Sequence, residues 1–219
     1  MNKINVITID GPSASGKGAL SRKIANTFGL NILDSGILYR LYAHFLKSNL
    51  SPKQIEEEIN NNINFNLGEE MLYVIHKNKD ITNELRSEKI AKYASQQSSK
   101  KEVRDTLFKI QRNFYNGIGL VADGRDMGTV VFKDAKLKIF LTASPDKRAK
   151  RRCFELQNRG QEVNMPALIA DIKERDTQDS MREISPLIPA EDSHLIDSSN
   201  MSLEEVFGIA ENLIKKEFI

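Results

Sequence analysis

Residues 4–20 read INVITIDGPSASGKGAL, and this stretch decides the fold. The run from Ile4 to Ile9 is largely apolar, which is typical of a buried parallel strand. Leu20, Ile24 and Phe28 then recur at four-residue intervals, as in an amphipathic helix. The glycines between these segments let the backbone curl, so that several N–H groups can point at an anion. The sequence therefore predicts a strand, a phosphate-binding loop and a helix, in that order.

The loop itself has the pattern G-x-x-x-x-G-K, which is typical of the P-loop of nucleotide-binding enzymes. The N-terminus of the following helix adds partial positive charge, and Lys17 can reach the outer phosphates. A hydroxyl that binds Mg²⁺ usually follows this lysine, but Gly18 and Ala19 offer none. The residues expected to bind the nucleotide phosphates are Gly11, Pro12, Ser13, Ala14, Ser15, Gly16, Lys17, Gly18 and Ala19.

Composition places the chain among ordinary globular proteins. Its 219 residues, of which 40% are hydrophobic and 28% charged, suit one α/β domain. A net charge of +2 gives no overall basic field, so we expect no nucleic-acid or membrane partner, and any anion site must be local. One cysteine, Cys153, excludes an internal disulfide and suits the cytoplasm. No apolar run is long enough to span a bilayer.

Four further apolar segments alternate with helical patterns and predict a parallel sheet with helices on both faces, the fold of P-loop enzymes. Two long interruptions follow the carboxyl ends of strands, which predicts a substrate-binding insertion and a lid beside the P-loop. Within the first, alternating residues near 61–82 predict a small antiparallel sheet. The four segments are 30–33, 118–122, 137–141 and 195–197.

The remainder of the insertion has a helical pattern from 83 to 115. A break is expected near Ser98, because Ser99 to Glu102 has the spacing of a capping box. Arg104 lies beside the apolar stripe of the second helix, and a helical arginine of this kind is more often solvated than functional.

Polar residues follow two of the predicted strands. Ser35 and Arg40 come after the strand 30–33, and an arginine near the start of a helix can bind phosphate bidentately, although a surface arginine is the alternative. Asp123, Arg125 and Asp126 follow the strand 118–122. An acid at the end of such a strand can hold Mg²⁺ directly or through water, so Asp123 is a candidate metal contact.

Two later helices are rich in charge. The first, starting at Ser144-Pro145, carries a cluster of basic residues that form either a solvated face or a phosphate-binding flap, and we favour a phosphate role for Arg148 and Arg152. In the second, positions 175, 179 and 182 are spaced so that arginine, carboxylate and arginine share one face. Taken alone, this pattern fits a surface ion-pair ladder equally well.

Together these motifs resemble the bacterial cytidylate kinases, enzymes that pass a phosphoryl group from ATP to CMP or dCMP. The resemblance covers nearly the whole chain. Its carriers include LDSG at 33–36, ADGRDMGTVVF at 122–132, and KERD at 173–176 with Asp179, Arg182 and SPL at 185–187. The GRDMGTVVF string and the block of Arg175, Asp179 and Arg182 are far more specific than the P-loop. Two departures stand out, Ala19 after the P-loop and Thr177-Gln178, where relatives often add a basic residue.

The resemblance implies an enzyme that binds ATP, Mg²⁺ and a cytidine monophosphate, and a monomeric, single-domain α/β protein with a five-stranded parallel core. The core would be 1–35, 116–149 and 167–219, the CMP-binding insertion 36–115 and the lid 150–166. Lys17, Arg125 and Arg182 would be catalytic. The CMP phosphate would lie among Ser35, Arg40, Arg125 and Arg182, the cytosine against Ser95, Arg104 and Asp126, and the sugar against Tyr39, Arg175 and Asp179.

Three alternatives stay open at this point. The nearest is a related P-loop kinase with another small acceptor such as UMP, against which the set Ser95, Arg104 and Asp126 argues. A nucleotide-dependent switch or nucleic-acid ATPase would need a basic track or an Asn-Lys-x-Asp motif, and the sequence has neither. A catalytically inactive ATP-binding module is the third.

Overall fold

A five-stranded sheet forms the centre of the computed structural model, which describes residues 3–69, 71–158 and 160–218. All four strand pairs run parallel, in the order β2-β6-β1-β7-β8. The carboxyl ends therefore meet at one edge, where Asp34 pairs with Asp123 and Asp10 with Gly124. The strands are β1 (Ile4–Asp10), β2 (Asn31–Asp34), β6 (Leu120–Gly124), β7 (Ala135–Thr142) and β8 (His194–Asp197). The predicted α/β fold with a five-stranded parallel sheet is confirmed.

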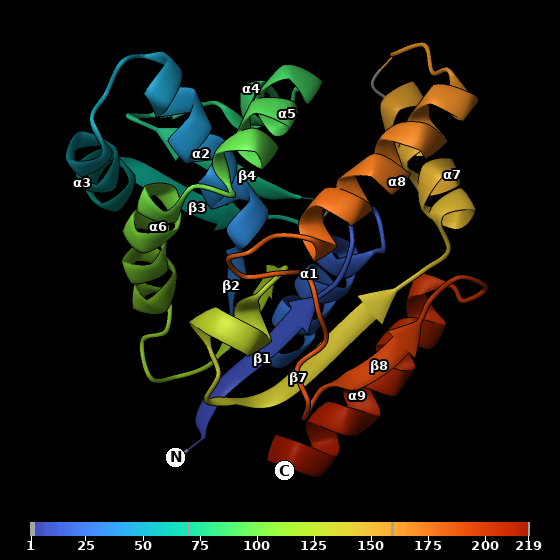
Figure 1. Ribbon diagram of the computed structural model, residues 1–219. Helices are drawn as coiled ribbons and strands as arrows, with labels where there is room; N and C mark the ends of the chain where they lie inside the picture. Colours follow the sequence, from blue (N-terminus) through green and yellow to red (C-terminus); the bar gives the residue numbers. More distant parts are fainter. Residues whose placement is uncertain (1–2, 70, 159, 219) are drawn as a thin grey trace.

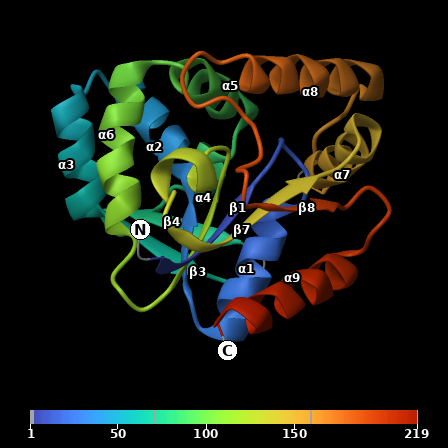
Figure 2. The ribbon, with the colours of Figure 1, turned by 60° about the horizontal axis from the view of Figure 1, so that its bottom comes forward.

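Helices cover both faces of this sheet, and Figures 1 and 2 show the two layers. On one face, α1 (Lys17–Phe28) and α9 (Leu203–Phe218) pack on Ile7, Ile9 and Ile139. On the other face, α2 (Ser35–Lys47) and α6 (Lys101–Asn113) form a second core with Val6 and Leu33. The β-strands alternate between these two cores because successive side chains point to opposite faces.

The segment between β2 and β6 contains the predicted antiparallel sheet, made of β3 (Ile63–Leu67), β4 (Leu72–His76) and β5 (Lys79–Asp80). It also contains α3 (Pro52–Asn62), α4 (Thr82–Leu85) and α5 (Glu88–Gln97). One expectation here is wrong. The capping box at Ser99 does not form, because α6 begins at Lys101 after Lys100, and the Ser99 hydroxyl donates instead to the Gln96 carbonyl at 3.1 Å.

Beyond β6 the chain makes a single turn of π-helix, η1 (Met127–Val131), which no sequence pattern indicated. Two long helices follow, α7 (Pro145–Gln157) and α8 (Met165–Ser180). The described part of the segment 150–166 is thus the end of α7, a connection and the start of α8, while Arg159 lies outside the described residues. Arg182 lies two residues beyond the end of α8 rather than on it.

In Figure 1 both chain ends lie at the bottom of the sheet, while α5, α7 and α8 rise above its upper edge. Cys153 of α7 is buried, as expected for a packing residue. Within the described ranges, no helix combines the length and the apolar character that crossing a membrane requires.

Candidate active site

A cavity of about 630 Å³ opens at the carboxyl edge of the sheet. Its lining comes from the P-loop, α2, α5, α6, α7, α8 and the segment after β6, so the fold brings together residues from all the predicted motifs. Three of the predicted site residues do not line it, namely Gly11, Pro12 and Arg148. Those that do are Ser13, Ala14, Ser15, Gly16, Lys17, Gly18, Ala19, Ser35, Tyr39, Arg40, Ser95, Arg104, Asp123, Arg125, Asp126, Arg152, Arg175, Asp179 and Arg182.

The P-loop runs tightly against β7. A Cβ on Gly11 would lie 2.0 Å from the Leu141 carbonyl oxygen, so no other residue fits there without moving backbone. Gly16 caps α1 with a φ of 102°, a conformation that glycine adopts at low cost. Lys17 is buried, and its Nζ donates to the Pro12 carbonyl at 2.8 Å. The ammonium is therefore held within the loop, facing the cavity.

Two residues hold the P-loop from behind, and the sequence did not single out either one. Arg151 of α7 donates to the Ser15 carbonyl at 2.9 Å and to the Ser198 hydroxyl at 3.0 Å. Ser198, directly after β8, donates to the same Ser15 carbonyl at 3.0 Å. Ser198 could have been found from the sequence because it directly follows a predicted strand. Arg151 could not, because it is one of several basic residues on its helix.

Arg148, for which a phosphate role was expected, does not line the cavity. Its side chain is buried outside the cavity, where it donates to the carbonyls of Ala143 at 2.8 Å and Ser13 at 3.2 Å. It also forms an ion pair with Asp176 of α8. The guanidinium is thus occupied with joining α7 to α8 and to the P-loop backbone. Arg152, one turn later, does line the cavity, and it pairs with Glu155 and, across to α5, with Glu88.

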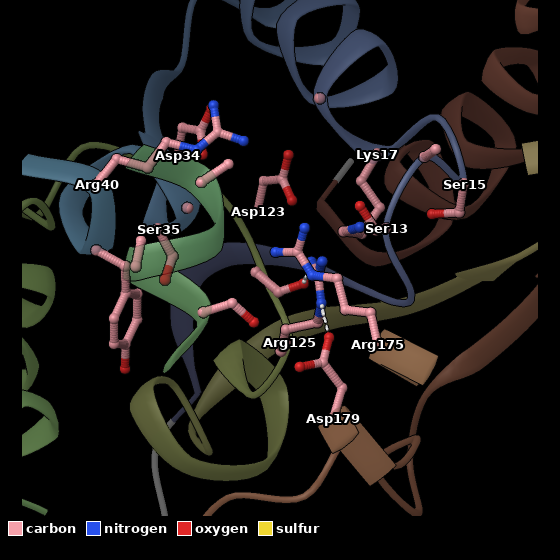
Figure 3. A pocket seen from close by; sticks show the side chains of 18 of the residues that line it. Ser13, Ser15, Lys17, Asp34, Ser35, Arg40, Asp123, Arg125, Arg175 and Asp179 are labelled. Atoms are coloured by element: carbon pink, nitrogen blue, oxygen red, sulfur yellow. Dashed lines mark hydrogen bonds and ion pairs between the residues drawn. The ribbon is translucent and has the colours of Figure 1, made fainter. Parts of the chain in front are cut away.

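Opposite the P-loop, the start of α2 forms another part of the wall, and Figure 3 shows Ser35 and Arg40 there, well apart from Lys17. Asp34 caps this helix by accepting from the Ile37 amide at 3.1 Å. The Ser35 hydroxyl accepts from Gln111 of α6 at 2.9 Å, a buried contact between distant segments. Burial lowers the pKa of Arg40 from its ordinary value, with Asp34 opposing the shift. Gln111 could have been noticed in the sequence as a polar residue within the apolar stripe of α6.

Arg104 and Asp126 form a buried ion pair at 2.7 Å on this side of the cavity. The guanidinium also lies 5.8 Å from the centre of the Tyr39 ring. Arg104 is therefore not a solvated helical arginine, the general expectation for such a position. Its Nε is buried without a hydrogen-bond partner among the described residues.

A cluster of three arginines around one carboxylate completes the wall. Asp179 is 1% exposed; it accepts from Arg125 at 3.0 Å and from Arg182. Arg175 lies beside them, and its Nε has no partner within the described part of the chain. Burial and the neighbouring Arg125 lower the pKa of Arg175 to about 10. More positive charge is gathered here than the single carboxylate neutralises, which is the arrangement of an anion site.

Asp123 stands between the two walls in Figure 3. Burial raises the pKa of this carboxyl, and the charge of Lys17 opposes the rise. A Cβ on Gly18 would lie 3.4 Å from Asp123 Oδ2 and 3.3 Å from the Arg22 guanidinium. Among the described residues, no group of three or more His, Cys, Asp or Glu side chains could hold a metal. Arg22 and Arg86 also line the cavity, although no motif in the sequence singled them out.

A P-loop between β1 and α1, a parallel sheet with β1 at its centre, and a basic cavity at the carboxyl edge define the class of P-loop kinases. Within that class, comparison with known proteins is specific. The family profile described as "Cytidylate kinase" matches residues 7–216, and the chain belongs to the cytidylate kinase family.

Curated relatives agree with this assignment over nearly the whole chain. The chain is 42% identical to the cytidylate kinase of Acinetobacter baylyi, over 96% of both chains. It is 43% identical to that of Photorhabdus laumondii, over 96% of this chain and 95% of the relative. It is 44% identical to that of Serratia proteamaculans, over 92% of this chain and 90% of the relative. These matches give no support to a UMP kinase.

Solved structures share the fold at much lower identity. The TM-score is 0.54 with an uncharacterized protein from Eubacterium ventriosum, which is 11% identical, over 96% of this chain and 98% of that one. For TT1252 from Thermus thermophilus the TM-score is 0.52 at 13% identity, over the whole of both chains.

Proposed function

We propose that this protein transfers the γ-phosphoryl group of ATP to CMP and dCMP, forming CDP and dCDP. The observation that carries the proposal is the buried pair of Arg104 and Asp126, which faces the same cavity as the P-loop. Cytosine presents an amino donor beside ring acceptors, and a carboxylate beside an arginine can recognise that edge. Membership of the cytidylate kinase family supports the same substrate.

The acceptor would lie along the wall formed by α2, α5, α6 and the segment after β6. Its phosphate would meet the arginines near Asp179, and each charge-assisted hydrogen bond of this kind contributes about 1.5–3 kcal/mol. We assign Ser35, Arg40, Arg125 and Arg182 to the phosphate, Ser95, Arg104 and Asp126 to the base, and Tyr39, Arg175 and Asp179 to the sugar.

The donor would lie on the P-loop, from Gly11 to Ala19, with its outer phosphates at Lys17 and with Arg152 closing the site from α7. In phosphoryl transfer the protein mainly positions the two phosphates in line and offsets their charge. We assign that role to Lys17, Arg125 and Arg182. The attacking oxygen belongs to a phosphate that is already largely ionised at pH 7, so no protein base is required.

The side chains present also fit Mg²⁺ held largely through water and the ATP phosphates. Asp123 and Asp34 occupy paired positions on β6 and β2 and both line the cavity, whereas Gly18 and Ala19 supply no hydroxyl. Of these two carboxylates, Asp123 has the larger raising effect on the pKa of Lys17. When bound, the ion would offset charge on the phosphates.

An assay of ADP release tests the proposal with CMP, dCMP, UMP, AMP and GMP as acceptors and ATP as donor. We expect CMP and dCMP to be preferred by at least about tenfold in kcat/KM, because a site built to hydrogen-bond one base leaves polar groups unpaired with another. Preference for any acceptor outside the cytidine pair would refute the assignment. Turnover stimulated by nucleic acid but not by CMP would identify an ATPase instead.

Lys17→Ala supplies the matched variant. It should lose nearly all transfer to CMP while the fold persists, as judged by circular dichroism, since Lys17 hydrogen-bonds only to its own loop among the described residues. A variant that turns over CMP at the wild-type rate would remove Lys17 from the catalytic group. We further propose, on family grounds, that the protein acts as a cytoplasmic monomer.

A further inference from the structure

Asp10 is a buried carboxylate to which the proposed reaction gives no role. It is the last residue of β1, directly before Gly11 of the P-loop, and is 5% exposed. Its side chain does not line the cavity. Burial raises the pKa of this carboxyl to about 7, against the lowering effect of its hydrogen bonds to Gly128 and Met127.

Both oxygens of Asp10 accept hydrogen bonds from backbone amides far away in the sequence. Oδ1 accepts from Met127 at 2.9 Å and Oδ2 from Gly128 at 2.8 Å. These amides are the first two of η1, and the N-cap of this turn, Asp126, provides no side-chain cap. The first amides of a helical turn lack partners within it, so Asp10 supplies from β1 the acceptors that the turn needs.

Close approach of the two backbones makes this contact possible. A Cβ on Gly128 would lie 2.9 Å from the Thr8 hydroxyl and 3.3 Å from Asp10 Oδ2. Thr8 and Asp10 face the same side of β1, so η1 is held against the strand along that face. The glycine is therefore explained by the contact with β1 rather than by a turn.

The residues just before these amides are Arg125 and Asp126. Arg125 contacts Asp179, and Asp126 contacts Arg104, so these two neighbours each pair with a residue that lines the cavity. We propose that Asp10 is a positioning residue that fixes the Arg125–Asp126 segment relative to the P-loop. A single carboxylate thereby sets the position of the acceptor site relative to the donor site. This inference rests on the proposed function, because it assigns the acceptor to those two side chains.

The competing explanation is that Asp10 only stabilises the fold. Both explanations predict a lower melting temperature for Asp10→Asn, because the NH₂ group of the asparagine side chain would face a backbone N–H group, and both are donors. Only the positioning role predicts that the acceptor site is damaged more than the donor site. It also predicts that Asp10 acts through Arg125 and Asp126, so that Asp10→Asn and Asp126→Asn are less than fully additive.

The test is steady-state kinetics of Asp10→Asn, Asp126→Asn and the double variant, with ATP and with CMP or UMP as acceptor. For Asp10→Asn we expect KM for CMP to rise about tenfold, KM for ATP to change less than about threefold, and the CMP-to-UMP ratio of kcat/KM to fall. In the Asp126→Asn background, Asp10→Asn should add less than about threefold to KM for CMP.

Thr8→Val is the matched control on the same face of β1. Thr8 is fully buried, and its hydroxyl has no hydrogen-bond partner among the described residues, so all three kinetic quantities should stay at wild-type values. If Asp10→Asn does not fold, Gly128→Ala displaces the same amides from the other side and should give the same split between the two KM values.

Equal increases of both KM values, or a lower melting temperature with unchanged KM values and unchanged CMP-to-UMP ratio, would overturn the positioning role. Additive effects of the two substitutions would do the same. The wild-type protein in the same assay separates the two levels of inference. If wild-type protein does not use CMP, the proposed function fails, whereas normal use of CMP by Asp10→Asn removes only the role of Asp10.

Discussion

At the scale of single residues, Lys17 carries the clearest electrostatic consequence. Its ammonium is buried, and burial together with the charge of Arg125 lowers its pKa, while Asp123 and Asp10 oppose the shift. The unfolded chain, with a lysine pKa near 10.4, then binds this proton more tightly than the folded protein. Lys17 therefore makes the free energy of unfolding rise with pH between its lowered pKa and about 10.4.

Nucleotide binding should reverse this shift. A triphosphate beside Lys17 favours the charged form, so we predict uptake of up to about one proton when ADP or ATP binds near pH 8.5. Calorimetry in buffers of different ionisation enthalpy measures this number. Lys17→Met should abolish most of the uptake and also the rise of stability with pH in the free protein. Proton uptake that persists in Lys17→Met would place the titrating group elsewhere.

At the scale of secondary-structure elements, Arg148 joins α7, α8 and the P-loop. Its guanidinium is buried and paired with the partly exposed Asp176. Arg148→Met leaves that carboxylate without its partner, and we predict a loss of about 3 kcal/mol in the free energy of unfolding. KM for CMP should stay close to the wild-type value, because the acceptor wall is untouched. Urea unfolding and steady-state kinetics measure the two effects.

Lys150→Met is the control on the same helix. Lys150 is exposed, so this substitution should change stability by no more than about 0.5 kcal/mol. If Arg148→Met is as stable as the wild type but binds ATP much more weakly, then Arg148 contacts phosphate after all and the structural role is wrong.

The elements also show what a sequence can reveal. The P-loop and the five strands were predictable because glycines, a lysine and apolar runs act locally, within a few residues. The turn η1 was not, because its N-terminus is satisfied by Asp10, a residue 117 positions from Met127 in the chain. Backbone amides leave no signature in the sequence. Arg148 and Arg152 were indistinguishable as basic helical residues, and only the packing of α7 against Ser13 and Asp176 separates their roles.

At the scale of the whole molecule, charge is unevenly distributed. The net charge is only +2, yet the described cavity lining has nine basic side chains and five acidic ones. This excess of like charge, gathered in a partly buried space, opposes folding of the free protein. This repulsion is offset when anionic substrates bind. The basic side chains that lower the stability of the free protein therefore raise its affinity for substrates.

Arg175→Met tests this relation between stability and affinity. Asp179 keeps Arg125 and Arg182 as partners, so the substitution removes a partly buried charge without leaving a carboxylate unpaired. We predict that the free protein becomes more stable by about 1 kcal/mol. The stabilisation conferred by saturating CMP should shrink, because it follows the affinity of the ligand. Denaturant unfolding with and without CMP measures both quantities.

Lys173→Met, at an exposed position of the same helix, should alter neither. Loss of stability in free Arg175→Met would show that this arginine supports the fold rather than opposing it.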